Sequence, residues 1–228
     1  MTVNNILFRC SQLGKIMTEA RAKSDVLSKT CISHLVEVYG FEKHGIENDI
    51  VSPFLEKGIF VEEDAITLLS INKKQFYKKN EERFKNDFIA GTPDIITKDC
   101  VIDIKSSWDF ITFSKSNIDG VSDTYYWQLQ GYMALLGLPR AELTYCLIDT
   151  PEHLIEAEKR KLSYKLGEGS EEKFKHLFEN IDKRSRFSQI PNEEKTHIKY
   201  IERNEKDIER IYSRVLECRE YLKNNFNL

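Results

Sequence analysis

Two aspartates and a lysine stand close together near the middle of this chain of 228 residues. Asp94 ends a Gly-Thr-Pro-Asp motif at the start of a predicted hairpin, and nine residues later Asp103 and Lys105 alternate with apolar residues. Because successive side chains of a strand point to opposite faces, Asp103 and Lys105 share a face that Asp94 could meet. Burying these charges costs several kcal/mol unless they are paired or hold a metal. The pattern therefore predicts a site where a hard cation activates a water for hydrolysis.

This predicted site has both oxygen ligands and a cationic group. Asp94 and Asp103 suit Mg²⁺, which prefers oxygen donors, and the backbone carbonyl of Ile104 could add a further ligand. Lys105 would lie beside the water, where it can orient or deprotonate it and stabilise the developing negative charge. The alternative for Lys105 is a stem packed on the strand with its ammonium group in solvent. A lone Asp-x-Lys is common by chance, but both motifs together favour catalysis.

A third carboxylate, Glu62, falls on the apolar stripe of a predicted helix. The stripe recurs at helical spacing and comprises Leu55, Ile59, Ile66 and Leu69. A carboxylate at such an inner position is explained by a metal site shared with Asp94 and Asp103. The alternatives are a glutamate at the rim with an exposed head, or a salt bridge to a core arginine. With the hairpin present, the metal site is the favoured interpretation of Glu62.

Two further pairs of residues could bind a phosphate. Gln128 and Tyr132 lie four residues apart in a predicted helix, so their amide and phenol face the same side and can bond a phosphate or Lys105. Arg9 and Ser11 open another predicted helix, where a guanidinium, a hydroxyl and free N–H groups suit a phosphate. From spacing alone, a surface arginine and a helix-capping serine explain Arg9 and Ser11 better.

The elements predicted around these residues are helices, then a mixed sheet, then helices. Helices are predicted over 9–39 with a break near Ser28, from Pro53 to about 71, and over 122–136; a polar connector over 40–52; and strands within 75–105 and over 143–148. Later come charged helices over 152–165 and 171–182, a strand over 197–201 and a last helix over 204–224. The order predicts a single α/β domain with a central mixed sheet flanked by helices. Its core covers about residues 1–150, followed by a helix-rich extension over 151–228.

The composition is that of an ordinary globular protein. A net charge of −3, from 34 basic and 37 acidic residues, gives no global attraction to nucleic acid or to a membrane, so any polyanion must be bound by local clusters. Five scattered cysteines without a C-x-x-C pair indicate reduced thiols and neither zinc nor an iron–sulphur cluster. No signal peptide or membrane span is predicted. The chain is therefore expected to be soluble and cytoplasmic.

In five motifs, taken in order, the chain resembles the PD-(D/E)xK nuclease superfamily. Within it, the resemblance is to the branch of phage lambda exonuclease and YqaJ-type viral recombinase nucleases. The motifs are Arg9-x-Ser11, Gly58-x-x-x-Glu62-x-x-Ala65, Gly91-Thr92-Pro93-Asp94, Asp103-Ile104-Lys105 and Gln128-x-x-x-Tyr132. They span roughly the first 150 residues. The resemblance implies a restriction-endonuclease-like core, a mixed sheet between helices.

The resemblance also implies a set of ligands and partners. It implies two Mg²⁺ or Mn²⁺ ions, held by Glu62, Asp94, Asp103 and the Ile104 carbonyl, with Lys105 as catalytic lysine and Arg9 and Ser11 near the DNA end or its phosphate. Relatives of this branch digest one strand of duplex DNA from an end. Lambda exonuclease is a ring-shaped trimer that hands its product to a single-strand annealing protein. Relatives with an iron–sulphur cluster need grouped cysteines, which this chain lacks.

The sequence thus predicts a Mg²⁺-dependent deoxyribonuclease, an exonuclease that degrades one strand of duplex DNA from its ends in phage-type recombination. If the chain is phage-encoded, it would act in the host cytoplasm. A water would attack the phosphorus in line and the 3′ oxygen would leave, giving a 5′-phosphate. One alternative is a structure-specific or restriction-like endonuclease of the same fold. Another is a non-catalytic DNA-binding module, which has no need to keep the three carboxylates and Lys105 together. Polarity, oligomeric state and the role of the C-terminal helices stay open.

Overall fold

A computed structural model describes residues 3–47, 52–167 and 169–226 of the chain. Its first elements are η1 (Val3–Asn5), β1 (Phe8–Arg9), η2 (Cys10–Gln12), α1 (Leu13–Ile16), α2 (Lys29–His44), α3 (Pro53–Phe60) and α4 (Glu62–Lys73). The middle contains β2 (Phe84–Lys85), β3 (Ile89–Gly91), β4 (Ile95–Ile96), β5 (Cys100–Ser106), α5 (Phe110–Ile118), α6 (Asp123–Leu136) and β6 (Arg140–Cys146). The last elements are α7 (Glu152–Leu166), α8 (Ser170–Lys173), α9 (Lys175–Ser185), η3 (Asn192–Glu194), β7 (Thr196–Glu202) and α10 (Glu205–Phe226).

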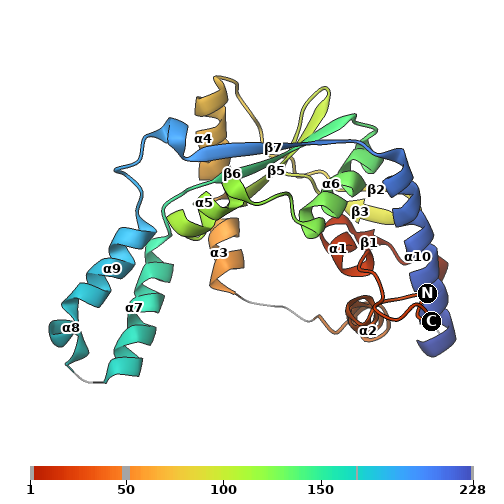
Figure 1. The fold of residues 1–228 in the computed structure, drawn as a ribbon, viewed down its shortest axis with the longest axis horizontal. Helices are drawn as coiled ribbons and strands as arrows, with labels where there is room; N and C mark the ends of the chain where they lie inside the picture. The colour runs from red at the N-terminus through yellow and green to blue at the C-terminus, as the bar shows by residue number, and fades with distance from the viewer. Residues whose placement is uncertain (1–2, 48–51, 168, 227–228) are drawn as a thin grey trace.

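The strands form two mixed sheets with helices around them (Figure 1). The smaller sheet has the order β1-β3-β2, with β1 parallel and β2 antiparallel to β3. The larger has the order β4-β5-β6-β7, in which only β5 and β6 are parallel among the pairs described. The predicted α/β class, with mixed pairing between helices, is confirmed, and its strands are divided between two sheets. Pro93 lies between β3 and β4. Because proline has no backbone N–H, it cannot donate a hydrogen bond to a neighbouring strand.

The predicted hairpin is present and forms one edge of the larger sheet. Strand β4 pairs antiparallel with β5, with Ile95 opposite Ile102 and Ile96 opposite Val101. Thr97 closes the turn, because its backbone N–H and its hydroxyl both donate to the Cys100 carbonyl. Continuing this register by one residue places Asp94 opposite Asp103. The local pattern therefore brings both aspartates to the same end of the hairpin.

Several predicted boundaries are wrong. Residues 9–39 do not begin as one helix, because Phe8–Arg9 pairs with β3 before the chain turns into η2 and α1. Helix α2 runs on to His44, where Gly45 caps it at a positive φ of 66°. The predicted connector therefore starts only at Gly45, and its residues 48–51 lie outside the described residues. Helix α5 has no counterpart among the predicted elements; a capping box between Asp109 and Thr112 starts it.

The last third of the chain returns to the core. Strand β7 pairs antiparallel with β6, and α10 packs beside α6, α1 and α2 (Figure 1). Four side chains of α10 are fully buried: Ile211, Val215, Cys218 and Leu222. The guanidinium of Arg219 donates to the Ile6 and Asp87 carbonyls. Helices α7, α8 and α9 instead form an arm that projects from the sheet (Figure 1). Among the described helices, none combines the length and the apolar character that crossing a bilayer requires.

Gly91 lies where β3, α6 and the N-terminal segment meet, and we expect Gly91→Ala to destabilise the protein. A Cβ on Gly91 would lie 2.5 Å from Tyr132 Cε1 and 3.1 Å from Cys10 Sγ. Relieving such a clash in a packed interior costs about 1–3 kcal/mol of unfolding free energy. Denaturant unfolding of the wild type and of Gly91→Ala measures this loss of unfolding free energy. Gly58→Ala is the control, because a Cβ on this helical glycine would meet no atom within 4 Å and should add about 0.5–1 kcal/mol of stability. Equal effects in both variants would contradict the packing argument.

Candidate active site

Strand β5 presents Asp103 and Lys105 on one face, as its alternation predicts. Asp103 is only 1% exposed, and its Oδ2 lies 2.6 Å from Lys105 Nζ. Its other oxygen, Oδ1, accepts a hydrogen bond of 2.8 Å from Gln128 Nε2 on α6. Isoleucines on the opposite face of β5 pack into a second apolar cluster with α4. The apolar face thus anchors the strand, and Gln128 and Lys105 hold the Asp103 carboxylate in one orientation.

Asp94 lies across the hairpin, next to this pair. Its Oδ2 accepts a hydrogen bond of 2.6 Å from the backbone N–H of Ile104. Burial and the negative charge of Asp103 raise the pKa of Asp94 to about 7, although Lys105 opposes the shift. The carboxylates of Asp103 and Asp94 raise the pKa of Lys105 above its usual value despite the opposing effect of burial. Lys105 is therefore an ammonium group in this state and suits charge stabilisation better than proton abstraction.

Glu62 reaches the site by a different route from the one predicted. The predicted stripe is broken at Val61, which separates α3 from α4, and Leu55 and Ile59 on α3 are 57% and 64% exposed. Glu62 stands at the start of α4, and its Oε2 accepts a bond of 2.9 Å from Lys79 Nζ. Its charge also contributes to the raised pKa of Asp94. Glu62 is therefore at the rim of the site and paired with a lysine.

The carboxylate oxygens of Asp94 and Asp103 are suitable ligands for a hard cation such as Mg²⁺. Asp94 and Asp103 provide oxygen ligands, and their negative charges repel each other where water is partly excluded. A bound cation would offset this repulsion. Within the described ranges, no three His, Cys, Asp or Glu side chains converge closely enough to enclose a metal. Glu62 lies at the rim, where its Oε2 is paired with Lys79. The peptide of Ile104 lies at the same point, because its N–H bonds to Asp94.

Helix α6 supplies the polar wall of the site. The predicted helix over 122–136 is confirmed, with Ser122 as its N-cap and Gly137, at a φ of 68°, as its C-cap. Gln128 Nε2 lies 3.2 Å from Tyr132 Oη, which in turn donates a hydrogen bond of 3.3 Å to the Thr92 carbonyl. The Tyr125 ring lies one turn earlier, 5.1 Å from Lys105 Nζ. Gln128 and Tyr132 therefore share one face of α6, as predicted. Gln128 contacts Asp103 and Tyr132 contacts the Gly-Thr-Pro-Asp segment.

Arg9 and Ser11 lie on the surface nearby, and both side chains are exposed. The residue between them, Cys10, is fully buried against Gly91 and Gly131. Arg9 lines a cavity of about 240 Å³ together with His34 and Glu37, whose side chains bond to each other. Within the described chain, neither Arg9 nor Ser11 bonds to the carboxylates. Their role in phosphate binding stays a prediction.

Two residues that hold the site carry no distinguishing signal in the sequence. Lys79 is the second of two adjacent lysines in a polar stretch, yet it bonds Glu62. The backbone N–H of Asn80 donates to the Asp94 carbonyl at 2.8 Å, and its Nδ2 donates to the Pro93 carbonyl at 2.9 Å. An asparagine in a polar loop gives no sequence signal of such contacts, because both depend on a segment more than ten residues away.

A buried lysine also supports the segment after β5. Lys57 on α3 is fully buried, and its Nζ donates to the Trp108 carbonyl at 2.9 Å. The ammonium also lies 5.7 Å from the Trp108 ring and 5.5 Å from the Phe187 ring. Burial lowers the pKa of Lys57 to about 8, against the charges of Asp149 and Asp109. Lys57 thus joins α3 to the segments that follow β5 and α9.

We expect the stability of the wild type to rise relative to Lys57→Met between pH 7 and pH 10.5. The folded pKa of about 8 lies below the ordinary 10.5, so the unfolded chain binds more protons in this window and folding is favoured as pH rises. Across this pH range the wild type should gain about 3 kcal/mol of unfolding free energy relative to Lys57→Met. Denaturant unfolding of both proteins across this pH range measures it. Parallel curves would show that Lys57 titrates normally.

The hairpin carboxylates, the lysine of β5 and the mixed α/β fold are the features in which the chain resembles the PD-(D/E)xK nucleases. A phage-related exonuclease from Haemophilus somnus 129PT has a similar structure, with 28% identity and a TM-score of 0.79, over 96% of this chain and 95% of that one. The chain therefore has the fold of the phage-related exonucleases, and the resemblance seen in its motifs is confirmed.

More distant structures share the fold. An alkaline exonuclease from Laribacter hongkongensis matches with 14% identity and a TM-score of 0.64, over 97% of this chain and 93% of that one. The same enzyme in complex with dAMP matches with 16% identity and a TM-score of 0.63, over 96% and 92%. No protein-family model and no curated protein matches the chain.

Proposed function

We propose that this protein is a metal-dependent DNA exonuclease that degrades one strand of duplex DNA from its ends. The observation that carries the proposal is the convergence of Asp94, Asp103 and Lys105 at one end of the β4–β5 hairpin. The similarity of almost the whole chain to a phage-related exonuclease supports the same class of reaction. The reaction is hydrolysis of a phosphodiester, in which water attacks phosphorus and the bond to the 3′ oxygen breaks.

Each side chain of the site has a part in this chemistry. The Lys105 ammonium lies beside Asp103, where it can stabilise the charge that develops on the phosphate and orient the attacking water. Gln128 holds Asp103 in place through Oδ1, and Tyr132 supports Gln128. Asp94, Asp103, Glu62 and the Ile104 carbonyl would hold one or two Mg²⁺ or Mn²⁺ ions. Bound there, the metal would lower the pKa of a water and neutralise phosphate charge.

Arg9 and Ser11 complete the proposal at the DNA end. Both are exposed, and they flank a cysteine that packs against Gly91 and therefore lie beside the Gly-Thr-Pro-Asp segment. An arginine fork and a hydroxyl suit a terminal phosphate. By the same resemblance, we propose a homotrimer and transfer of the product strand to a single-strand annealing protein. Mass measurement in solution tests the trimer directly.

The test of the proposed function is digestion of a linear duplex with one labelled 5′ end beside a supercoiled circle. We expect Mg²⁺-dependent loss of the linear DNA, with the circle untouched and no reaction in EDTA. Early release of the 5′ label would set the polarity. Nicking of the circle would instead support the endonuclease alternative. No cleavage of either DNA, with Mg²⁺ or Mn²⁺, would reject the proposed function.

A further inference from the structure

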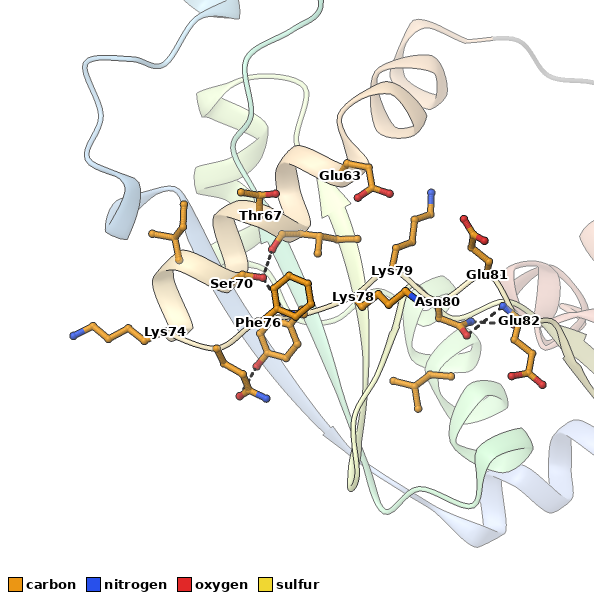
Figure 2. Close-up of a pocket in the computed structure, with 15 residues that line it drawn as sticks. Glu63, Thr67, Ser70, Lys74, Phe76, Lys78, Lys79, Asn80, Glu81 and Glu82 are labelled. Atoms are coloured by element: carbon orange, nitrogen blue, oxygen red, sulfur yellow. Dashed lines mark hydrogen bonds between the residues drawn. The ribbon is translucent and has the colours of Figure 1, made fainter.

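A groove of about 940 Å³ lies between helix α4 and the segment 75–82, beside the candidate active site (Figure 2). The residues of the groove that matter here are Lys74, Phe76, Lys78, Lys79 and Asn80. None of the motifs that indicate a nuclease includes them. A groove of this size is within the range of ligand-binding clefts in proteins.

Two residues that line the groove also bond to residues of the candidate active site. Lys79, in its lining, bonds to Glu62, and Asn80 bonds to the backbone carbonyls of Pro93 and Asp94. A strand whose scissile phosphate lies at Asp94 could reach the groove by passing Lys79 and Asn80. Figure 2 shows Lys79 and Asn80 next to each other and Phe76 further along the same segment.

The groove presents one aromatic ring to solvent. Phe76 is 86% exposed, whereas its neighbour Tyr77 is only 7% exposed. The segment is held on α4, because the Tyr77 N–H donates to Ser70 Oγ at 3.1 Å and Ser70 Oγ donates to the Ile66 carbonyl at 2.8 Å. The Phe76 backbone is therefore fixed while its ring stays uncovered. An uncovered ring on a fixed segment is a stacking platform available to a base.

The charges beside this ring favour a nucleotide chain over a peptide. Lys74 and Lys78 flank Phe76, and neither forms an ion pair with any residue in the described part of the chain. Alternating ammonium groups and an aromatic face match the phosphates and bases of a single strand. Glu63, Glu81 and Glu82 also line the groove, so the attraction is local to the Lys74–Lys78 end.

We propose that this groove binds a single-stranded segment of the DNA substrate, with one base stacked on Phe76 and phosphates near Lys74 and Lys78. The inference rests on the proposed function, because it assigns the path of a strand that leaves the carboxylates. It goes beyond that function by naming a contact surface outside the catalytic motifs. Bases of any identity would stack, so the contact carries no sequence specificity.

The experiment compares Phe76 with an equally exposed aromatic residue far from the site. Tyr164 on α7 is 92% exposed and lies on the projecting arm (Figure 1). The first readout is the fluorescence of Phe76→Trp and of Tyr164→Trp on adding an oligothymidylate of roughly ten nucleotides, in EDTA to prevent hydrolysis. The second readout is the affinity of Phe76→Ala and Tyr164→Ala for the same fluorescein-labelled oligothymidylate.

We expect the added tryptophan at position 76 to be quenched and that at 164 to be unaffected. Phe76→Ala should bind the oligothymidylate roughly tenfold more weakly than the wild type, and Tyr164→Ala as well as the wild type. If the wild type digests linear duplex DNA but both Phe76 variants behave as their Tyr164 counterparts do, the groove proposal alone is overturned. A change in oligomeric mass in Phe76→Ala with unchanged DNA affinity would also overturn it, in favour of a second copy of the chain in the groove. A wild type that neither binds nor digests DNA would overturn both proposals.

Discussion

We expect Lys105→Ala to lower the rate of hydrolysis of linear duplex DNA by about a thousandfold, the loss typical when a preorganised donor to a transition-state charge is removed. The reason is local. Lys105 Nζ lies 2.6 Å from Asp103 Oδ2, and the neighbouring carboxylates keep it protonated. No other ammonium group among the described residues forms an ion pair with Asp103. Initial rates of digestion in Mg²⁺ measure the effect.

The control is Lys98→Ala, at the turn of the same hairpin. Lys98 lies at the end of the hairpin away from Asp94, so its variant should retain the rate of the wild type. Removing Lys105 also leaves the buried Asp103 carboxylate without its counter-charge, so thermal unfolding must accompany the assay. A folded Lys105→Ala protein with the rate of the wild type would contradict the mechanism.

We expect Asp94→Asn to make the metal-free protein more stable above pH 7 and to remove its response to divalent cations. The folded pKa of Asp94 is raised from 3.8 to about 7, so the folded protein binds more protons between these values and loses stability as pH rises through them. Asparagine imitates the protonated form at every pH. We expect a gain of about 1–3 kcal/mol at pH 8, less than the full shift implies because part of the side chain meets solvent.

The same variant tests the metal without an activity assay. In the wild type, Mg²⁺ at about a hundred times its Kd should add about 3 kcal/mol to the unfolding free energy, and in Asp94→Asn it should add little. Asp99→Asn is the matched control, since this aspartate stands at the turn of the same hairpin and pairs with Arg140 on the surface. Its response to Mg²⁺ should equal that of the wild type. Equal responses of wild type and Asp94→Asn would exclude Asp94 as a ligand.

The sequence alone predicts some of the residue arrangements on which these experiments depend, but not all of them. The hairpin aspartates and Lys105 are neighbours in the chain, so the two-residue period of a strand and a turn at Lys98 suffice to bring them together. The face shared by Gln128 and Tyr132 is equally local, because it depends on the period of one helix with clear caps. The sequence pattern does not show which residue this face contacts. Gln128 bonds to Asp103, which lies 25 residues earlier in the chain.

The same limit explains where the structure departs from the predicted elements. The stripe through Leu55 and Glu62 has helical spacing, but the chain breaks the helix at Val61 so that only the α4 half packs on the second cluster. Pro93 stands between β3 and β4, where the chain passes from the smaller sheet to the larger one.

The amino-acid sequence by itself determined the hairpin, the carboxylates and lysine on it, and the helix of Gln128, because these depend on periods and turns within about ten to fifteen residues. Only the tertiary structure decided that Glu62 pairs with Lys79, that β7 and α10 return to the core, and that Phe76 stands uncovered beside the site. Those outcomes depend on which distant surfaces bury one another. The free energy of such packing is shared among many residues, and no short segment of the chain carries its signal.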